Sequence, residues 1–283
     1  MITVSLSAKG KKVGKLPASL SSYKGVPASE LVQIIAKKTG LNPNRLRLKQ
    51  DDKTLDNKQI ISDDVHLVVK DLGPQISWRT VFVCEYAGPL LIHPLIFFGL
   101  YDKHSSAQYI TLAMVMLHFL KREYETMFVH RFSAETMPFF NLFKNCAHYW
   151  IIGGALLAWF TYGPAYAVET WQFPKIAVFT FVMGEMCNLK THKILRDLRR
   201  PGSTERRIPY GLGFDWVSCP NYFFEILCWV GISATTGSHA AWAFTIVSAA
   251  QMWQWSLKKH QRYLKEFPKD YPKDRKILIP FVL

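Results

Sequence analysis

Long apolar stretches dominate residues 78–257 and constrain the fold of this chain more than any other feature. A helix needs about 20 predominantly apolar residues to cross a bilayer, and several of these stretches are shorter, so their boundaries are loose. The six stretches lie at about 78–99, 106–120, 145–163, 174–189, 221–237 and 239–257. The pattern predicts a mainly α fold, a polytopic transmembrane bundle of six or seven helices.

Lysine and arginine are distributed unevenly among the segments that connect these stretches. If the chain is threaded through six spans, 33 of its 35 basic residues fall on one side, and the opposite loops keep only Lys103 and Lys175. Cytosolic loops of membrane proteins carry such an excess of positive charge, so we expect both termini to be cytosolic. This placement explains the formal net charge of +14. We therefore expect no nucleic-acid partner, although a basic surface by itself attracts polyphosphates.

Residues 1–72 are polar and lysine-rich, and their pattern predicts a small soluble domain. Short apolar or alternating runs favour β-strands, and they occur at 2–6, 13–16, 46–48 and 65–69. A turn at Gly10–Lys11 separates the first two. A helix is expected between Pro27 and Gly40, because apolar residues recur there at helical spacing and glycine commonly ends a helix. Hairpin, helix and further strands follow in the order of a β-grasp, ubiquitin-like domain, which precedes the membrane domain at 73–283.

Polar side chains interrupt the apolar stretches at Glu85, Glu185, Asn188, Asn221 and Glu225. A charged side chain is costly inside a membrane, so such residues mark a functional site or pair with one another. For Glu185 we favour an interhelical hydrogen bond. The five cysteines include no Cys-x-x-Cys pair, and we interpret them as reduced, packed thiols and expect no metal site.

One helix face carries a polar stripe that begins at membrane depth. Its members recur at steps of four, four and three residues, as Asn188, His192, Arg196 and Arg199. The stripe would suit a long anionic ligand, because guanidinium groups bind phosphate through two parallel hydrogen bonds. A snorkelling basic collar is the alternative, but a collar does not require asparagine or histidine. Charge interleaved with aromatic residues at 258–267 is typical either of an interfacial anchor or of a segment that closes over a nucleotide.

Six further segments carry motifs whose combination is unexpected by chance: 71–78, 85–90, 125–133, 143–146, 217–222 and 279–281. Together they resemble the trans-2-enoyl-CoA reductases of very-long-chain fatty acid elongation in the endoplasmic reticulum, members of the steroid 5α-reductase superfamily. The match covers essentially the whole chain. No Gly-x-Gly-x-x-Gly follows a predicted strand, so a dinucleotide would not be held by a Rossmann domain.

The resemblance implies an NADPH-dependent reduction of the 2,3 double bond of a long-chain enoyl-CoA, the last step of the elongation cycle. It implies catalytic roles for Glu85 and Tyr222, since the enolate that hydride addition creates needs a positioned hydrogen-bond or proton donor. For the cofactor it implies Asn188, His192, Arg196, Arg199, Asn221, Glu225, Lys259 and Tyr263. His130 and Arg131 are further candidates for contacts with phosphate.

The sequence departs from the steroid reductases at two aromatic positions. Phe119 replaces a carbonyl-binding tyrosine, and Tyr222 replaces a phenylalanine, which favours the enoyl-CoA branch. The alternatives are a steroid or polyprenol enone reductase on the same fold, a membrane methyltransferase and a non-catalytic membrane scaffold. The partners we expect are the enoyl-CoA substrate, membrane lipids and other fatty acid elongation enzymes, at the endoplasmic-reticulum membrane.

Overall fold

The structure, a computed structural model, describes residues 2–8, 13–22, 25–132, 135–167, 174–199 and 206–282. The chain divides into two compact units. One comprises Met1–Trp78 with Ala134–Asn141, and the other comprises Arg79–Ser133 with Leu142–Leu283. The turn expected at Gly10–Lys11 lies outside the described residues.

A mixed five-stranded sheet forms the centre of the first unit, with the strand order β2-β1-β7-β4-β5. These strands are β1 (Ile2–Ala8), β2 (Ser19–Ser22), β4 (Leu46–Gln50), β5 (Lys53–Thr54) and β7 (Val65–Asp71). β1 runs antiparallel to β2 and parallel to β7, where Leu6 lies opposite Leu67. Two short antiparallel pairs complete the strands: β3 (Val26–Pro27) with β6 (Ile60–Ile61), and β8 (Gln75–Ser77) with β9 (Thr136–Pro138).

Helix α1 (Ala28–Thr39) supplies the rest of the core of this unit. Its Leu31 and Ile35 are fully buried in one cluster with Leu67 and other strand residues. The helix ends at Gly40, whose φ of 71° is the left-handed conformation that glycine adopts without strain, and whose N–H donates to the Ala36 carbonyl. The helix expected from the sequence is therefore confirmed. The prediction of a strand at 13–16 is wrong, because the second strand is β2, which begins at Ser19.

The prediction of a ubiquitin-like β-grasp domain needs correction. The first unit is a mixed sheet with two additional strand pairs and is not a clear ubiquitin-like grasp. One of these pairs takes its second strand, β9, from residues 136–138, far beyond the expected domain end at residue 72. Alternating apolar residues predict where strands lie, but they do not specify which strands pair.

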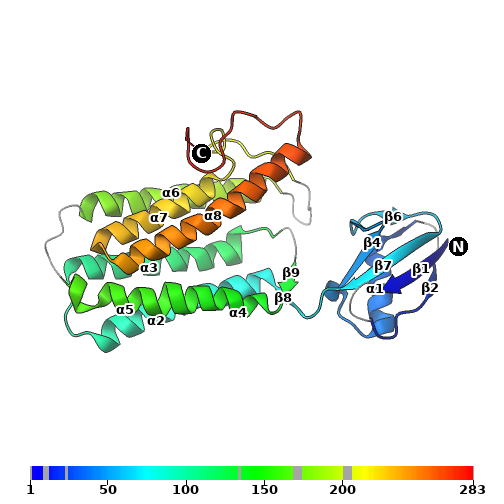
Figure 1. Ribbon diagram of the computed structural model, residues 1–283, viewed down its shortest axis with the longest axis horizontal. Helices are drawn as coiled ribbons and strands as arrows, with labels where there is room; N and C mark the ends of the chain where they lie inside the picture. Colours follow the sequence, from blue (N-terminus) through cyan, green and yellow to red (C-terminus); the bar gives the residue numbers. More distant parts are fainter. Residues whose placement is uncertain are drawn as a thin grey trace. The chain divides into compact units, whose positions relative to one another are not determined.

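Seven α-helices of the second unit run alongside one another in Figure 1, within the part of the chain that the structure describes. They are α2 (Trp78–Leu100), α3 (Ser106–Tyr124), α4 (Asn141–Cys146), α5 (Leu157–Tyr162), α6 (Pro174–Asp197), α7 (Pro220–Thr236) and α8 (His239–Glu266). Two π-helical segments, η2 (Glu125–Val129) and η3 (Ala147–Leu156), extend α3 and join α4 to α5. Helix α7 is central, because it packs against α3, α6 and α8.

Helices α6 and α7 approach each other closely at two glycines. A Cβ atom at Gly231 would lie 2.7 Å from the Ala177 carbonyl oxygen and 2.9 Å from the backbone nitrogen of Phe181. A Cβ atom at Gly184 would lie 2.8 Å from Sγ of Cys228. Real Cβ atoms do not come so near backbone atoms, so the contact requires glycine at these positions.

The prediction of a polytopic bundle with six or seven spans is also wrong for the described residues. Helix α2 alone among them is long and apolar enough to cross a membrane. Three of the other apolar stretches do not form a helix that could cross a membrane, each for a physical reason. Helix α7 has only 17 residues, and α3 ends in charged residues. The stretch at 145–163 is divided between π-helical and short α-helical segments. Hydropathy over a window does not reveal these interruptions.

Candidate functional site

The C-terminal half of α3 carries ionisable side chains along one side of the helix. Lys121 and Arg122 lie three and four residues after His118, and Glu125 lies four and three residues after them, which places all four within reach of the same neighbouring helices. Glu125 is fully buried and begins the π-helical segment η2. A π-turn adds a residue to the turn and often occurs at functional sites, and here it carries the end of α3 toward α6.

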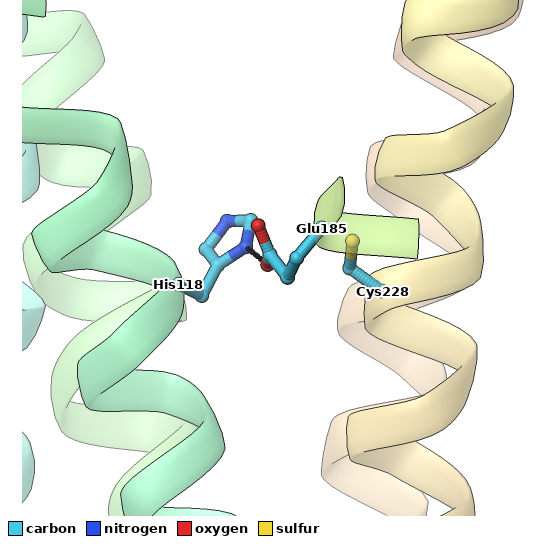
Figure 2. A group of neighbouring side chains, drawn as sticks. All are labelled: His118, Glu185 and Cys228. Atoms are coloured by element: carbon cyan, nitrogen blue, oxygen red, sulfur yellow. Dashed lines mark hydrogen bonds and ion pairs between the residues drawn. The ribbon is translucent and has the colours of Figure 1, made fainter. Parts of the chain in front are cut away.

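His118 contacts two carboxylates. Its Nδ1 lies 2.5 Å from Oε1 of Glu185 on α6, and its Nε2 lies 3.3 Å from Oε1 of Glu225 on α7. Figure 2 shows the imidazole facing the Glu185 carboxyl between the helices, with the Cys228 side chain nearby on α7. Because each carboxylate can only accept, both ring nitrogens donate, and His118 is held as an imidazolium.

Lys121 joins the same group of side chains. Its Nζ lies 2.6 Å from Oε2 of Glu185 and 2.5 Å from Oδ1 of Asn188. The Asn188 amide in turn donates to the Asn221 carbonyl at 2.8 Å and to Oε2 of Glu225 at 3.0 Å. These bonds connect α3, α6 and α7 and confirm that Glu185 is an interhelical hydrogen-bond partner.

Arg122 and Glu125 form the next pair. Nη1 of Arg122 lies 2.6 Å from Oε2 of Glu125, and Oε1 of Glu125 lies 2.9 Å from Nδ1 of His192. Burial of the Glu125 carboxyl opposes ionisation, but Arg122 and His192 outweigh it and lower the pKa of Glu125 to about 2. Burial lowers the pKa of His192, against the effect of Glu125. His192 is therefore neutral near pH 7.

The cluster balances three cationic side chains against three carboxylates: His118, Lys121 and Arg122 against Glu125, Glu185 and Glu225. We call these six residues the buried ion cluster. Charges removed from water are stable only when each is paired and hydrogen-bonded, and replacing a single member leaves its partner uncompensated. The cluster therefore depends on all three helices keeping their register.

Two groups of side chains have ligand atoms within 4.8 Å of one another: His118, Glu185 and Cys228, and Glu125, His130 and His192. Their carboxylates are already paired with cations of the protein. A divalent ion would lie close to Lys121 in the first group and to Arg122 in the second, and the like charges would repel. The geometry therefore disfavours a metal, and the absence of a metal site stays a prediction.

Glu85, predicted to be catalytic, lies on α2 and is 2% exposed. Asn145 and Tyr86 are hydrogen-bonding neighbours of its carboxyl. Its Oε2 is buried and has no hydrogen-bond partner among the described residues. A buried carboxyl oxygen that is free of protein partners is chemically available to a reactant.

Tyr222, the other predicted catalytic residue, begins α7 and packs its ring 6.1 Å from that of Trp255 on α8. Lys259, Arg122 and Glu225 are its charged neighbours. No hydrogen bond links Glu85 to Tyr222 within the described ranges. Each lies instead at a different edge of the buried ion cluster, and their catalytic roles stay predictions.

The C-terminal end of α8 holds Lys259 and Tyr263. Nζ of Lys259 lies 6.0 Å from the centre of the Tyr263 ring, which stacks on Tyr271 with the centroids 5.2 Å apart. The Tyr271 hydroxyl lies 2.6 Å from Oγ of Ser218, and that Oγ lies 2.6 Å from Nδ1 of His260. These contacts fix the segment after α8 against the residues that precede α7.

The two arginines of the polar stripe have different surroundings. Arg196 is half-buried and pairs with Asp197 at 2.7 Å. Arg199 donates to the Arg131 carbonyl at 2.7 Å, and Nη1 of Arg131 donates back to the carbonyls of Arg196 and Arg199. The structure thus brings Asn188 and His192 into contact with the buried ion cluster, whereas the arginines lie beyond its end.

Sequence reasoning missed the members of the buried ion cluster that α3 contributes. Lys121 and Arg122 were interpreted only as basic residues at the end of an apolar stretch, and Glu125 only as part of a motif. The spacing of His118, Lys121, Arg122 and Glu125 was the available signal, because it places charge and imidazole on one helix face.

Comparison with known proteins identifies the family. The family described as 3-oxo-5-alpha-steroid 4-dehydrogenase matches residues 135–283. A very-long-chain enoyl-CoA reductase of Dictyostelium discoideum is 45% identical over 96% of this chain and 92% of its own length. A putative enoyl reductase of Schizosaccharomyces pombe is 47% identical over 100% of both chains, and a probable very-long-chain enoyl-CoA reductase of Caenorhabditis elegans is 40% identical over 93% of this chain and 94% of its own. The resemblance drawn from the motifs is confirmed: the chain belongs to the very-long-chain enoyl-CoA reductases, within the 3-oxo-5-alpha-steroid 4-dehydrogenase family.

Proposed function

We propose that this protein reduces the 2,3 double bond of long-chain trans-2-enoyl-CoA thioesters with NADPH, as the last step of a fatty acid elongation cycle. The observation that carries the proposal is the end-to-end similarity to enoyl reductases, at 40–47% identity over nearly the full length of both chains. Such similarity includes the segments that contain Glu85 and Tyr222. The buried polar interior of the helical unit supports it, since a redox enzyme needs positioned donors away from water.

The chemistry asks for a hydrogen-bond donor at the thioester oxygen and a proton donor at the α-carbon. The nicotinamide cofactor, when bound, supplies the hydride for the β-carbon. We assign the oxygen and proton roles to Glu85 and Tyr222, either of which can donate a hydrogen bond when protonated. The buried Oε2 of Glu85, without a partner among the described residues, fits a group that waits for a reactant.

The cofactor would be held by residues from three helices. We propose Asn188, His192, Arg196 and Arg199 from α6 and its end, Asn221 and Glu225 from α7, and Lys259 and Tyr263 from α8. Nδ1 of His192 faces Arg122 and Glu125 of the protein, which leaves Nε2 for a hydrogen bond with the cofactor. Arg199 and Lys259 offer positive charge for phosphates. The donor set therefore fits a phosphorylated dinucleotide.

We place the enzyme at the endoplasmic-reticulum membrane. The apolar helix α2 and the exposed side chains of Leu95, Phe98, Phe179 and Ile246 support an association with lipid. The acyl chain of the substrate would then enter from the membrane, and the CoA group from the cytosol. Other elongation enzymes are the protein partners we propose.

The proposal is tested with the purified full-length chain in detergent or liposomes. NADPH oxidation should require trans-2-hexadecenoyl-CoA, and mass spectrometry should identify saturated hexadecanoyl-CoA as the product. Glu85→Gln and Tyr222→Phe should each lower kcat about 100-fold or more, the range that a positioned acid–base group contributes. A steroid enone serves as the competing substrate. Turnover of the enone without turnover of the enoyl-CoA would reject the assignment, as would full activity in both variants.

A further inference from the structure

Tyr86 is a buried tyrosine of the helical unit that the proposed mechanism does not use. Its ring packs 6.2 Å from that of Phe119 on α3, and it is the residue after Glu85 on α2. Tyr86 is 3% exposed, and its hydroxyl accepts a hydrogen bond from Nη2 of Arg122 at 2.9 Å. A phenol therefore lies in the interior next to the proposed catalytic carboxyl in the sequence.

Arg122 contacts Tyr86 in two ways. It donates a hydrogen bond to the hydroxyl, and it lies over the ring with the guanidinium carbon 5.1 Å from the ring centre. Because a guanidinium can only donate, the phenolic oxygen is the acceptor of this bond. Tyr86 directly follows Glu85 on α2, so the bond holds the turn of the helix that carries the Glu85 carboxyl.

Arg122 is itself held in place from the opposite direction. Its Nη1 lies 2.6 Å from Oε2 of Glu125, and Oε1 of that carboxylate lies 2.9 Å from Nδ1 of His192. The contacts form a continuous buried chain from α2 through α3 to α6, in the order Tyr86, Arg122, Glu125 and His192. One end directly follows the proposed catalytic residue Glu85 on α2, and the other is a proposed cofactor-binding imidazole.

We propose that Tyr86 and Arg122 are positioning residues for the reaction: the bond between Arg122 and Tyr86 fixes the turn of α2 that carries Glu85, so that the free oxygen of its carboxyl faces the reacting thioester. The inference rests on the proposed function of Glu85 and adds two residues to it. The planar fork of Arg122 is essential to this role, because it bonds Tyr86 and Glu125 at the same time. Lysine retains the charge but has a single nitrogen and cannot reproduce both bonds in this geometry.

A purely structural role for Tyr86 is the competing explanation, and the neighbouring Tyr149 provides its control. The Tyr149 ring lies 5.2 Å from the Tyr86 ring and edge-on to it, in the same aromatic cluster. Tyr149→Phe deletes the same atom from the same cluster without touching Arg122. If the Tyr86 hydroxyl mattered only for packing, the two variants would behave alike.

The decisive experiment measures kcat and KM for enoyl-CoA reduction by the full-length protein carrying Tyr86→Phe, alone and combined with Glu85→Gln. We expect Tyr86→Phe to lower kcat about 10-fold or more, with KM within about 2-fold, because the orientation of an acid–base group affects the reacting state. In the Glu85→Gln background, where the oriented carboxylate is gone, Tyr86→Phe should cause no further loss. Single-turnover rates give the values for the slow variants.

Arg122→Lys provides a second, independent measurement. It should lower kcat at least as much as Tyr86→Phe, and the double variant of Arg122→Lys with Tyr86→Phe should be no slower than Arg122→Lys alone, because both act through one chain of contacts. The folded state of each variant is checked by its thermal midpoint.

Three results would overturn the inference: losses that multiply in the double variants, an equal loss in Tyr149→Phe, or wild-type kcat in Tyr86→Phe. Each of these requires an active wild-type enzyme. An inactive wild-type protein would instead refute the proposed function, and the positioning roles would fall with it.

Discussion

The carboxylate of Glu185 on α6 lies 2.6 Å from the ammonium group of Lys121 on α3, between helices rather than at a surface. Both side chains are largely removed from solvent, with exposed fractions of 13% and 14%. His118 lies on the other oxygen of the same carboxylate. Removal of Glu185 would thus take the nearer of two carboxylate partners from each of two buried cations.

We expect Glu185→Gln to destabilise the protein by about 3 kcal/mol or more, the cost typical of breaking a buried ion pair from one side. The measurement is the thermal unfolding midpoint of the purified variant. Asp197→Asn is the matched control, because it removes a carboxylate that pairs with Arg196 at the exposed end of the same helix. Equal midpoints for the two variants would contradict the importance of the buried ion cluster.

Stability should fall in mildly acidic solution because of His130. Burial, aided by Arg122 and His192, lowers the pKa of His130 from 6.5 to about 3. The unfolded chain therefore binds a proton below pH 6.5 that the folded chain does not bind until about pH 3, so the contribution of His130 is present above pH 6.5 and is lost as the pH falls across this window. His130→Gln should flatten the pH dependence of the unfolding midpoint between pH 6.5 and pH 4. The exposed His66→Gln is the control, and the same flattening in it would refute the assignment.

Close helix approach should make Gly231→Ala destabilising. The added methyl group would collide with the Ala177 carbonyl and the Phe181 backbone, neither of which can move without separating α6 from α7. We expect a loss of about 1–3 kcal/mol, as in other overpacked interiors, measured as a lower thermal midpoint. Gly99→Ala provides the comparison, since nothing lies within 4 Å of its added Cβ atom and alanine favours the helix. An unchanged thermal midpoint in the Gly231→Ala variant would show that the helices separate easily.

The charge of Lys259 should contribute to cofactor affinity. We expect Lys259→Met to weaken NADPH binding about 10- to 100-fold, since a hydrogen bond to a charged group is worth about 1.5–3 kcal/mol. Quenching of cofactor fluorescence gives the dissociation constant. Lys258→Met removes the same charge from the adjacent exposed position and should have little effect. Unchanged affinity in Lys259→Met would remove this residue from the proposed cofactor site.

Local signals in the sequence predicted individual elements better than their assembly. The helix before Gly40 follows from apolar spacing and a left-handed glycine, both properties of a few adjacent residues. The pairing of β8 with β9 joins Ile76 to Met137, about 60 residues apart, and no local pattern records such a partner. The length of the apolar stretches also led to a wrong prediction of membrane spans. π-Helical turns and charged helix ends divide stretches that look continuous in composition.

In the candidate site, too, local patterns predicted single residues better than contacts between distant segments. Steps of four residues predicted that Asn188 and His192 share a face of α6, and both contact the buried ion cluster. The contribution of α3 was missed because basic residues at the end of an apolar stretch have an ordinary explanation in membrane topology. Only the fold shows that Arg122 points inward, to Tyr86 and Glu125.

The glycine contact between α6 and α7 has a mechanical consequence for ligand entry. Backbones in direct contact cannot slide or rotate past one another without steric collision, so these two helices move as a single rigid body. The proposed cofactor residues Asn188, His192, Asn221 and Glu225 all belong to that body, and their mutual geometry is preserved when the protein breathes. Any opening that admits a ligand must then come from the helices packed around this pair.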